Sequence, residues 1–329
     1  MRASNLIYAA LACLVLLPGP ARAAEESPLE MAKGAFAKGE YTQAIELLKN
    51  VAGGNPAEGD VNVLLARSYL ELNQYDAAVS SAEKAVAISP GNSDYHRWLG
   101  EAYGAKADHA SMLSAYSLAR KTQKEFEAAV RLDARNFDAQ QDLIEYDCTA
   151  PGMVGGGEEK ALPLIEDLKT MDTAEGHYAA GICRAQKKNY SAADAEFSAA
   201  LESRPKSAKR IYGIGDYFVQ RKNAEKLLAV AGAGEELAPH DPRGKFYRGV
   251  ALVLQGQKPA EAEKLLREYL RVAPVYSEYP RPWAVHYWLG RLQESRKNAA
   301  GARGEYQAAL KLNGKYKPAQ EALKQLGKD

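Results

Sequence analysis

A glycine-rich turn is the stretch of this sequence whose composition first suggests a site for chemistry. Residues 150–157 read APGMVGGG, and glycine-rich turns can hold a phosphate with backbone amides. Glu158 and Glu159 follow at once and would repel a phosphate, and there is neither a G-K-[ST] segment nor a preceding strand pattern. The turn is therefore interpreted as a tight connector that packs Met153 and Val154 against a neighbouring helix, with a ligand-binding loop as the alternative.

Side chains that serve as nucleophiles or proton donors are present without a recognisable arrangement. Serine, histidine and aspartate all occur, but the sequence contains no nucleophile-elbow motif and no triad that can be placed. The sequence therefore predicts a protein that is not an enzyme and needs no cofactor.

The elements that position these residues are paired helices. In residues 177–205, HYAAGICRAQKKNYSAADAEFSAALESRP, one helical pattern carries Gly181 and the next carries Phe197 and Ala200. Pro205 ends the second helix, because proline cannot continue the hydrogen-bond ladder. The small residues let the two helices approach closely, and Phe197 is expected to fill the space between them.

This unit resembles the tetratricopeptide repeat, a helix-turn-helix of about 34 residues with the pattern W-x2-L-G-x2-Y, A-x3-F-x2-A and a final proline. The first half of the pattern returns at residues 98–103, and nearly a whole unit returns at residues 288–309. Eight units are predicted, beginning near Glu25, Gly59, Ser93, Phe137, Ala174, Ala208, Pro242 and Trp283.

The resemblance implies an all-α fold. We expect a right-handed superhelical α-solenoid of about eight helix pairs, with residues 317–326 as a C-terminal capping helix and no sheet. Because each unit buries its apolar face on its neighbours, about 300 residues can form one elongated body.

The first residues have the features of a secretory signal peptide. Arg2 precedes an apolar run from Leu6 to Leu17, and Ala21-Arg22-Ala23 is a small-x-small cleavage site. We expect a signal peptide over residues 1–23, a solenoid over residues 24–329, and an exported protein that is periplasmic or secreted. Lipid attachment at Cys13 is disfavoured because the apolar run continues past it, and no segment of the mature chain is expected to span a membrane.

The charge of the chain is nearly balanced. The net charge is +1, and removal of Arg2 and Arg22 with the signal peptide leaves +1 − 2 = −1. A basic field of the kind that attracts nucleic acid is absent, so no nucleic-acid partner is expected.

Two insertions interrupt the repeat, near residues 106–121 and 150–157. Both fall at the turn between the two helices of a unit, in the third and fourth units, so they should be neighbours on one edge of the solenoid. The first has helical spacing and would lengthen a helix by nearly three turns. The second should not be helical, because Pro151 and its glycines disfavour a helix. This combination is similar to a group of exported bacterial tetratricopeptide repeat proteins with an APG-x2-GGG turn.

The mature chain keeps two cysteines, Cys148 and Cys183, which the repeat register places late in the first helices of consecutive units. An exported chain meets an oxidising compartment, so a disulfide between them is one expectation. Two small buried thiols are the other. A metal or redox site is disfavoured because there is no C-x-x-C.

Three histidines share one position of the repeat, in the first helices of three units: His96, His177 and His286. They lie two or more units apart, and each unit advances the solenoid by roughly 10 Å, the spacing of packed helices. Their nitrogens therefore cannot meet at the roughly 2 Å that zinc requires. We expect packing roles for them and no metal site.

The resemblance also implies where a partner binds, because four positions of the first helix usually face the concave groove. At the fifth position the last four units carry an aromatic stripe of Tyr178, Tyr212, Phe246 and Tyr287. In the first half the same surface carries charged side chains, among them Arg97 and Glu101. Aromatic side chains offer apolar area at low entropic cost, so these six residues are the predicted partner-binding groove.

The sequence therefore favours a non-catalytic protein–protein interaction scaffold or adaptor of the periplasm or cell envelope, which holds a peptide or partner protein in its groove. The alternative is a glycan- or solute-binding receptor that uses the aromatic stripe for stacking.

Overall fold

The computed structural model describes residues 27–51 and 58–327; the predicted signal peptide and Cys13 lie outside them. Within these ranges the chain forms seventeen α-helices and one 3-10 turn, with no strand. The helices are α1 (Pro28–Ala37), α2 (Tyr41–Lys49), α3 (Glu58–Glu71), α4 (Tyr75–Ile88), α5 (Ser93–Ala107), α6 (Met112–Leu132), α7 (Phe137–Thr149), α8 (Glu158–Met171), α9 (Thr173–Gln186), α10 (Tyr190–Glu202), α11 (Ala208–Arg221), α12 (Ala224–Leu237), α13 (Arg243–Gln255), α14 (Pro259–Val272), α15 (Pro282–Ser295), α16 (Ala299–Leu312) and α17 (Lys317–Leu326), and the 3-10 turn η1 covers Gly152–Val154.

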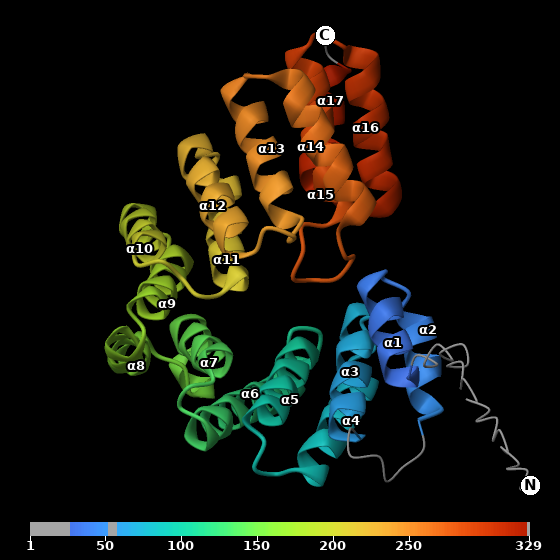
Figure 1. The fold of residues 1–329 in the computed structure, drawn as a ribbon. Helices are drawn as coiled ribbons and strands as arrows, with labels where there is room; N and C mark the ends of the chain where they lie inside the picture. Colours follow the sequence, from blue (N-terminus) through green and yellow to red (C-terminus); the bar gives the residue numbers. More distant parts are fainter. Residues whose placement is uncertain (1–26, 52–57, 328–329) are drawn as a thin grey trace, which may run out of the picture.

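The helices pair in chain order into a solenoid of eight pairs, from α1 and α2 to α15 and α16, and α17 packs on α16 (Figure 1). Glycines allow this close pairing. A Cβ atom at Gly100, Gly181 or Gly290 would lie 2.5, 2.6 or 2.3 Å from a ring carbon of the second helix of its own pair. The all-α solenoid and the packing of Phe197 against Gly181 are thus confirmed.

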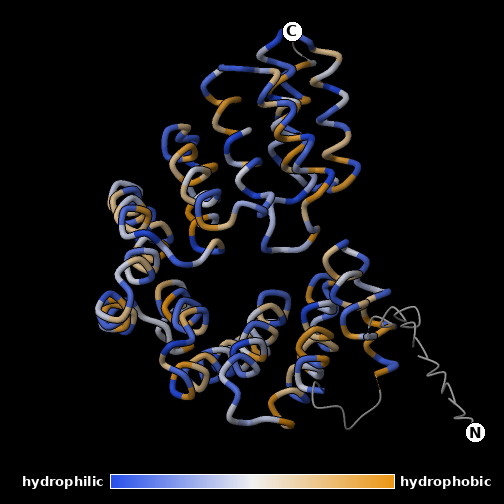
Figure 2. The backbone as a smooth tube through the Cα atoms, viewed as in Figure 1, coloured by the Kyte–Doolittle hydropathy of each residue, from blue (hydrophilic) through white to orange (hydrophobic). Residues whose placement is uncertain are grey.

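The apolar residues are distributed among the pairs rather than gathered in one centre (Figure 2). The largest buried cluster extends from α10 to α15, and a smaller one joins α1, α2 and α3. This distribution is typical of solenoids, in which each unit buries its apolar face on the next.

The solenoid curves into a ring whose two ends are joined by residues 273–281, the segment between α14 and α15 that we call the clasp (Figure 1). The backbone N–H of Val275 donates to the carbonyl of Ala37 at the end of α1, at 2.8 Å, and the Tyr41 hydroxyl donates to the carbonyl of Val275. Arg281 forms an ion pair of 2.6 Å with Glu71 of α3. Every described hydrogen bond between the two ends of the ring involves the clasp.

The insertions take shapes that differ in detail from the prediction. Helix α6 has 21 residues against at most 14 in the other second helices, a gain of about two turns rather than three. Residues 150–157 contain no α-helix, but Gly152–Val154 form one 3-10 turn, so the prediction of a wholly non-helical turn is wrong there. Gly156 is buried, and a Cβ atom on it would lie 2.1 Å from the carbonyl oxygen of Ala150. The chain therefore has room only for glycine at this point.

Cys148 of α7 and Cys183 of α9 form a disulfide in the structure, with their Cα atoms 5.4 Å apart and both side chains buried. The register of consecutive first helices brings them together, since α7 and α9 pack directly on each other.

We expect protein purified from an oxidising compartment to contain no free thiol. Reduction, or replacement of both cysteines by serine, should lower the free energy of unfolding by about 2–4 kcal/mol, because the bond closes a loop in the unfolded chain. Thiol titration in denaturant, paired with chemical unfolding curves, measures both quantities. Two reactive thiols in the untreated denatured protein would contradict the expectation.

Candidate functional site: the inner face of the ring

The predicted aromatic stripe is not a continuous groove surface, and the prediction is wrong for two of its four members. Tyr212 and Phe246 are only 1% and 2% exposed. The Tyr212 ring stacks on Tyr247 of the next pair at 5.4 Å, and a Cβ atom on Gly234 would lie 2.4 Å from the Tyr212 ring. This position of the first helix therefore fills the space between successive units.

The other two members of the stripe are partly buried. Tyr178 packs edge-on against Phe197, with ring centroids 5.9 Å apart, and Tyr287 lies 5.9 Å from both Tyr306 and Tyr316. Tyr287 thus packs between the last helix pair and α17. The basis for a stacking platform along the ring is lost, because its central members are in the core.

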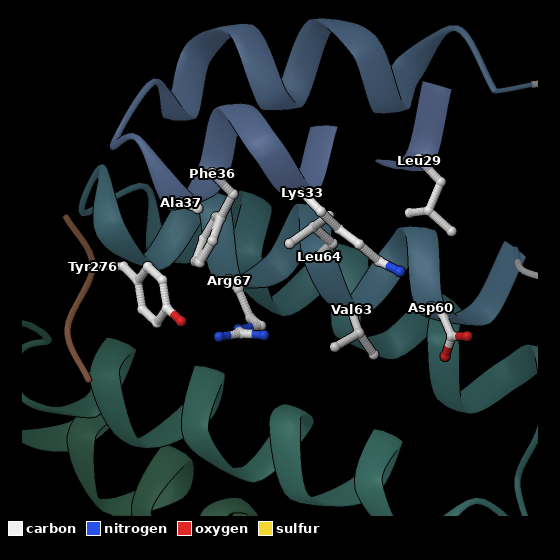
Figure 3. A pocket seen from close by; sticks show the side chains of 9 residues that line it. All are labelled: Leu29, Lys33, Phe36, Ala37, Asp60, Val63, Leu64, Arg67 and Tyr276. Atoms are coloured by element: carbon white, nitrogen blue, oxygen red, sulfur yellow. The ribbon is translucent and has the colours of Figure 1, made fainter. Parts of the chain in front are cut away.

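The inner face carries instead an open pocket at the first two pairs (Figure 3). Its cavity is about 310 Å³, and α1, α3 and the clasp line it. Its floor is apolar, and charged side chains stand around it. The lining residues are Leu29, Lys33, Phe36, Ala37, Asp60, Val63, Leu64, Arg67 and Tyr276.

Arg67 connects this pocket to the clasp and to the next pair. Its guanidinium carbon lies 4.9 Å from the Phe36 ring, 4.7 Å from the Trp98 ring and 6.0 Å from the Tyr276 ring. It also forms an ion pair of 3.2 Å with Glu278 of the clasp. Cation–π contacts of this kind hold a guanidinium in place, so the clasp forms one wall of the pocket.

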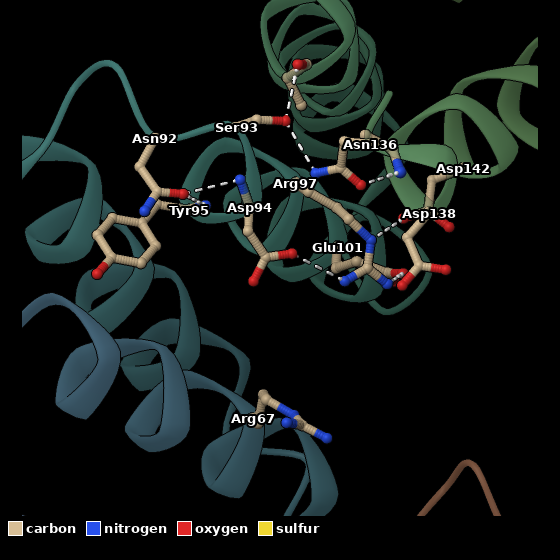
Figure 4. A network of polar contacts seen from close by, with 12 residues as sticks. Arg67, Asn92, Ser93, Asp94, Tyr95, Arg97, Glu101, Asn136, Asp138 and Asp142 are labelled. Carbon is tan, nitrogen blue, oxygen red and sulfur yellow. Dashed lines mark hydrogen bonds and ion pairs between the residues drawn. The ribbon is translucent and has the colours of Figure 1, made fainter. Parts of the chain in front are cut away.

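A polar network occupies the inner face beyond the pocket, on α5 and α7 (Figure 4). Arg97 is only 5% exposed, and its Nε lies 2.7 Å from a carboxylate oxygen of Asp142. It also pairs with Asp94 at 3.5 Å and with Glu101 at 3.8 Å. Arg97, predicted as a groove residue, is therefore held in the wall by ion pairs, whereas the side chain of Glu101 is 41% exposed and faces the groove.

The pKa values of two carboxyl groups in this network are shifted in opposite directions. Enclosure in the inner face, followed by repulsion from Asp142, raises the pKa of Glu101 to about 7. Burial disfavours ionisation of Asp138 as well, but Arg210 and Lys209 outweigh it and hold the pKa of Asp138 at about 2. The network thus keeps one carboxyl group fully ionised and leaves another able to accept a proton near neutral pH.

A second, larger hollow of about 550 Å³ extends from this network toward the inserted edge. Glu101, Asp142 and Glu145 line one part of it, and apolar residues of α6 and of the turn after α7 line the rest, among them Phe126 and Val154. The inner face is therefore continuous with the edge where both insertions lie.

The histidines have a role that the sequence analysis missed. His96, His177 and His286 each place Nδ1 within 2.6–2.7 Å of a glutamate of the second helix in the same pair, and these partners are Glu125, Glu196 and Glu305. The sequence separations are 29, 19 and 19 residues, and the first exceeds the others by the ten inserted residues. That constant spacing could have predicted the histidine–glutamate pairs from the sequence. Within the described residues no group of three His, Cys, Asp or Glu side chains could hold a metal, and no helix is long and apolar enough to cross a bilayer.

The paired helices, their glycine contacts and the curved inner face define the class of protein: an α-solenoid built from helical repeats. Two family models, both described as the tetratricopeptide repeat, match residues 35–99 and 254–317. The chain is a tetratricopeptide repeat protein, and such repeats generally indicate a scaffold for protein–protein interactions.

Solved structures that resemble this chain have low sequence identity to it. A thermophilic tetratricopeptide repeat protein of Thermus thermophilus is 17% identical over 70% of this chain and 100% of its own, with a TM-score of 0.44. A tetratricopeptide repeat protein of Parabacteroides merdae is 15% identical over 91% and 97%, with a TM-score of 0.44. Human IFIT1, solved as a dimer with PPP-AAAA, is 18% identical over 90% and 71%, with a TM-score of 0.50. Among curated proteins none matches.

Proposed function

We propose that this chain is a non-catalytic scaffold or adaptor of the cell envelope that holds an extended segment of a partner protein on the inner face of its ring. The observation that carries the proposal is the pocket at α1 and α3, which has an apolar floor and charged surroundings on the concave surface. Sites that bind peptide side chains combine these two features. Export to the periplasm rests on the N-terminal sequence pattern.

The charge of the inner face favours a protein partner over a nucleic acid. Human IFIT1 was solved with PPP-AAAA. In this chain the acidic side chains of α5 and α7 exceed the cations that neutralise them: Asp94, Glu101, Asp138, Asp142, Glu145 and nearby Glu175 face Arg97, Lys209 and Arg210. A surplus of carboxylates repels a phosphate backbone and suits a segment with basic residues.

The clasp limits how the partner enters. Because residues 273–281 join the two ends, a segment reaches the inner face along the axis of the ring or after the clasp has separated from α1 and α3. A single extended chain meets this requirement. The aromatic stripe offers no stacking surface for a glycan, because Tyr212 and Phe246 are buried.

Filling the pocket should abolish partner binding without unfolding the protein. Ala37 is partly exposed at the end of α1 and lines the cavity, so Ala37→Phe places a ring in the space that a partner side chain would occupy. We expect at least a tenfold loss of affinity, since tenfold corresponds to about 1.4 kcal/mol of binding free energy, less than the roughly 2 kcal/mol or more that a buried anchor contributes. The measurement is co-purification from the envelope fraction, followed by titration of the captured partner.

The matched control is Ala300→Phe, an equal increase in size at an exposed position of α16. Its partner capture and its melting temperature should equal those of the unmodified chain. Equal affinity of the Ala37→Phe variant and the unmodified chain for the captured partner would show that the partner does not use this pocket.

A further inference from the structure

The most exposed apolar side chains in the described part of the chain lie at the start of α6. Met112 and Leu113 are each 88% exposed, and Tyr116 one turn later is 44% exposed. Apart from Met153 of η1 at 71%, the other exposed large hydrophobic residues in the described ranges lie between 41% and 53%. Two adjacent large apolar side chains with this exposed fraction require a physical explanation.

The length of α6 explains why they are exposed. The buried residues of α6 begin only at Leu118, so the first six residues of the helix contribute nothing to the core. The helix is anchored from its third turn onward, where Gln123 donates to the carbonyl of Gly155 at 2.8 Å and the Tyr146 hydroxyl contacts the carbonyls of Ala119 and Val154. The apolar pair therefore projects on the first turn of a helix that is anchored further along.

Positive charge follows directly behind the apolar pair. Arg120, Lys121 and Lys124 are exposed, and no acidic residue occurs between positions 112 and 124. None of the three forms an ion pair within the described part of the chain, although Lys121 lies 5.0 Å from the centre of the Tyr103 ring. With Tyr116 and Glu127 they line a surface hollow of about 480 Å³. In a chain of net charge close to zero, this is a local basic field.

We propose that this surface, which we call the α6 tip (Met112, Leu113, Tyr116, Arg120, Lys121 and Lys124), docks the protein on a membrane that contains anionic phospholipid. The apolar pair enters the boundary between headgroups and acyl chains, and the three cations meet the phosphates. Leu113 and Arg120 are seven residues apart, roughly 10 Å along a helix, which matches the roughly 5–10 Å to which interfacial helices bury their apolar side.

The geometry favours a bilayer over a folded partner or an acidic peptide. Met112 and Leu113 project from the end of a helix and do not line the hollow beside it, so a protein partner would have to supply a complementary pocket of its own. A bilayer accepts a protruding apolar pair without shape complementarity. Docking through this edge would fix the orientation of the ring relative to the membrane.

The test is co-sedimentation with vesicles, using the chain from Ala24, which contains every described helix and lacks the apolar run at residues 6–17 that would itself bind lipid. We expect binding to vesicles of phosphatidylglycerol and phosphatidylcholine, weakening with salt, and no binding to phosphatidylcholine alone. Met112→Ser with Leu113→Ser should lower the partition coefficient more than tenfold, since the two apolar side chains that the bilayer buries on docking are lost. Arg120→Gln, Lys121→Gln and Lys124→Gln together should lower it by roughly 100-fold and remove the salt dependence.

The control is Ile88→Ser with Leu312→Ser, two exposed apolar residues on other helices, 47% and 53% exposed. It should bind like the unmodified chain, and all variants should keep its melting temperature because every substituted side chain is exposed. Failure to bind anionic vesicles, equal binding to neutral vesicles, or full binding by either tip variant would overturn the proposal. Capture of a soluble acidic peptide without vesicle binding would overturn it too and would mark the hollow as a peptide site.

Discussion

Replacing Tyr212 and Phe246 by alanine together is expected to unfold the C-terminal half of the ring. Both rings are buried: Tyr212 stacks on Tyr247 of the next helix pair, and Phe246 lies 5.4 Å from Tyr269 of its own pair. Loss of a buried aromatic ring costs about 3–5 kcal/mol in free energy of unfolding, because it removes apolar burial and leaves a cavity. In a solenoid that loss falls on the interface of neighbouring repeats.

Thermal and urea unfolding followed by circular dichroism measure this loss. Tyr190→Ala is the control, because that ring is 41% exposed on α10 and lies under Arg221. It should cost less than about 1 kcal/mol, as surface substitutions usually do. If the double variant melts like the unmodified chain and loses only its partner, the two rings belong to a binding surface after all.

Replacing Arg97 by methionine is expected to cost about 3–5 kcal/mol in free energy of unfolding at neutral pH. The substitution removes the single cation that pairs with Asp94, Glu101 and Asp142, and Arg97 itself is 5% exposed. Methionine preserves most of the packing of the aliphatic part of the arginine side chain, so the measured loss of stability reflects the removal of the charge. Asp142→Asn in the same chain should restore part of the stability, since the carboxylate closest to the lost guanidinium is then neutral.

The cost should depend on pH in a defined direction. Without Arg97 the neighbouring carboxyl groups repel one another, so their pKa values in the folded protein rise above those of the unfolded chain. As the pH falls, a carboxyl group with a raised pKa takes up its proton in the folded state before it does so in the unfolded chain. The stability that this protonation contributes is lost as the pH rises through the raised pKa. Because the pKa of Glu101 is already about 7, the deficit should be largest above about pH 7 and smallest near about pH 4. A deficit that is constant with pH would indicate a packing defect instead.

Local periodicity was sufficient to predict the units of this fold. The helix pairs, their boundaries and the glycine–aromatic contacts follow from a pattern of about 34 residues, because each contact joins helices that are adjacent in the chain. The register of Cys148 and Cys183 could be read for the same reason. The spacing of 19 residues from His177 to Glu196 and from His286 to Glu305 would have predicted these two ion pairs for the same reason.

The tertiary structure decided which surfaces are available. The repeat places Tyr212 and Phe246 at a position that often faces a groove, but the packing of neighbouring helices determines whether that position meets water. Here Tyr212 meets the next unit and Phe246 meets the second helix of its own unit. Closure of the ring has no repeating signal, because it depends on the sum of the seven angles between successive pairs and on one segment, residues 273–281, that occurs once. The pocket wall at Tyr276 follows from this closure, which no pattern between neighbouring residues encodes, and the burial of Arg97 follows from the packing of α5 on α7.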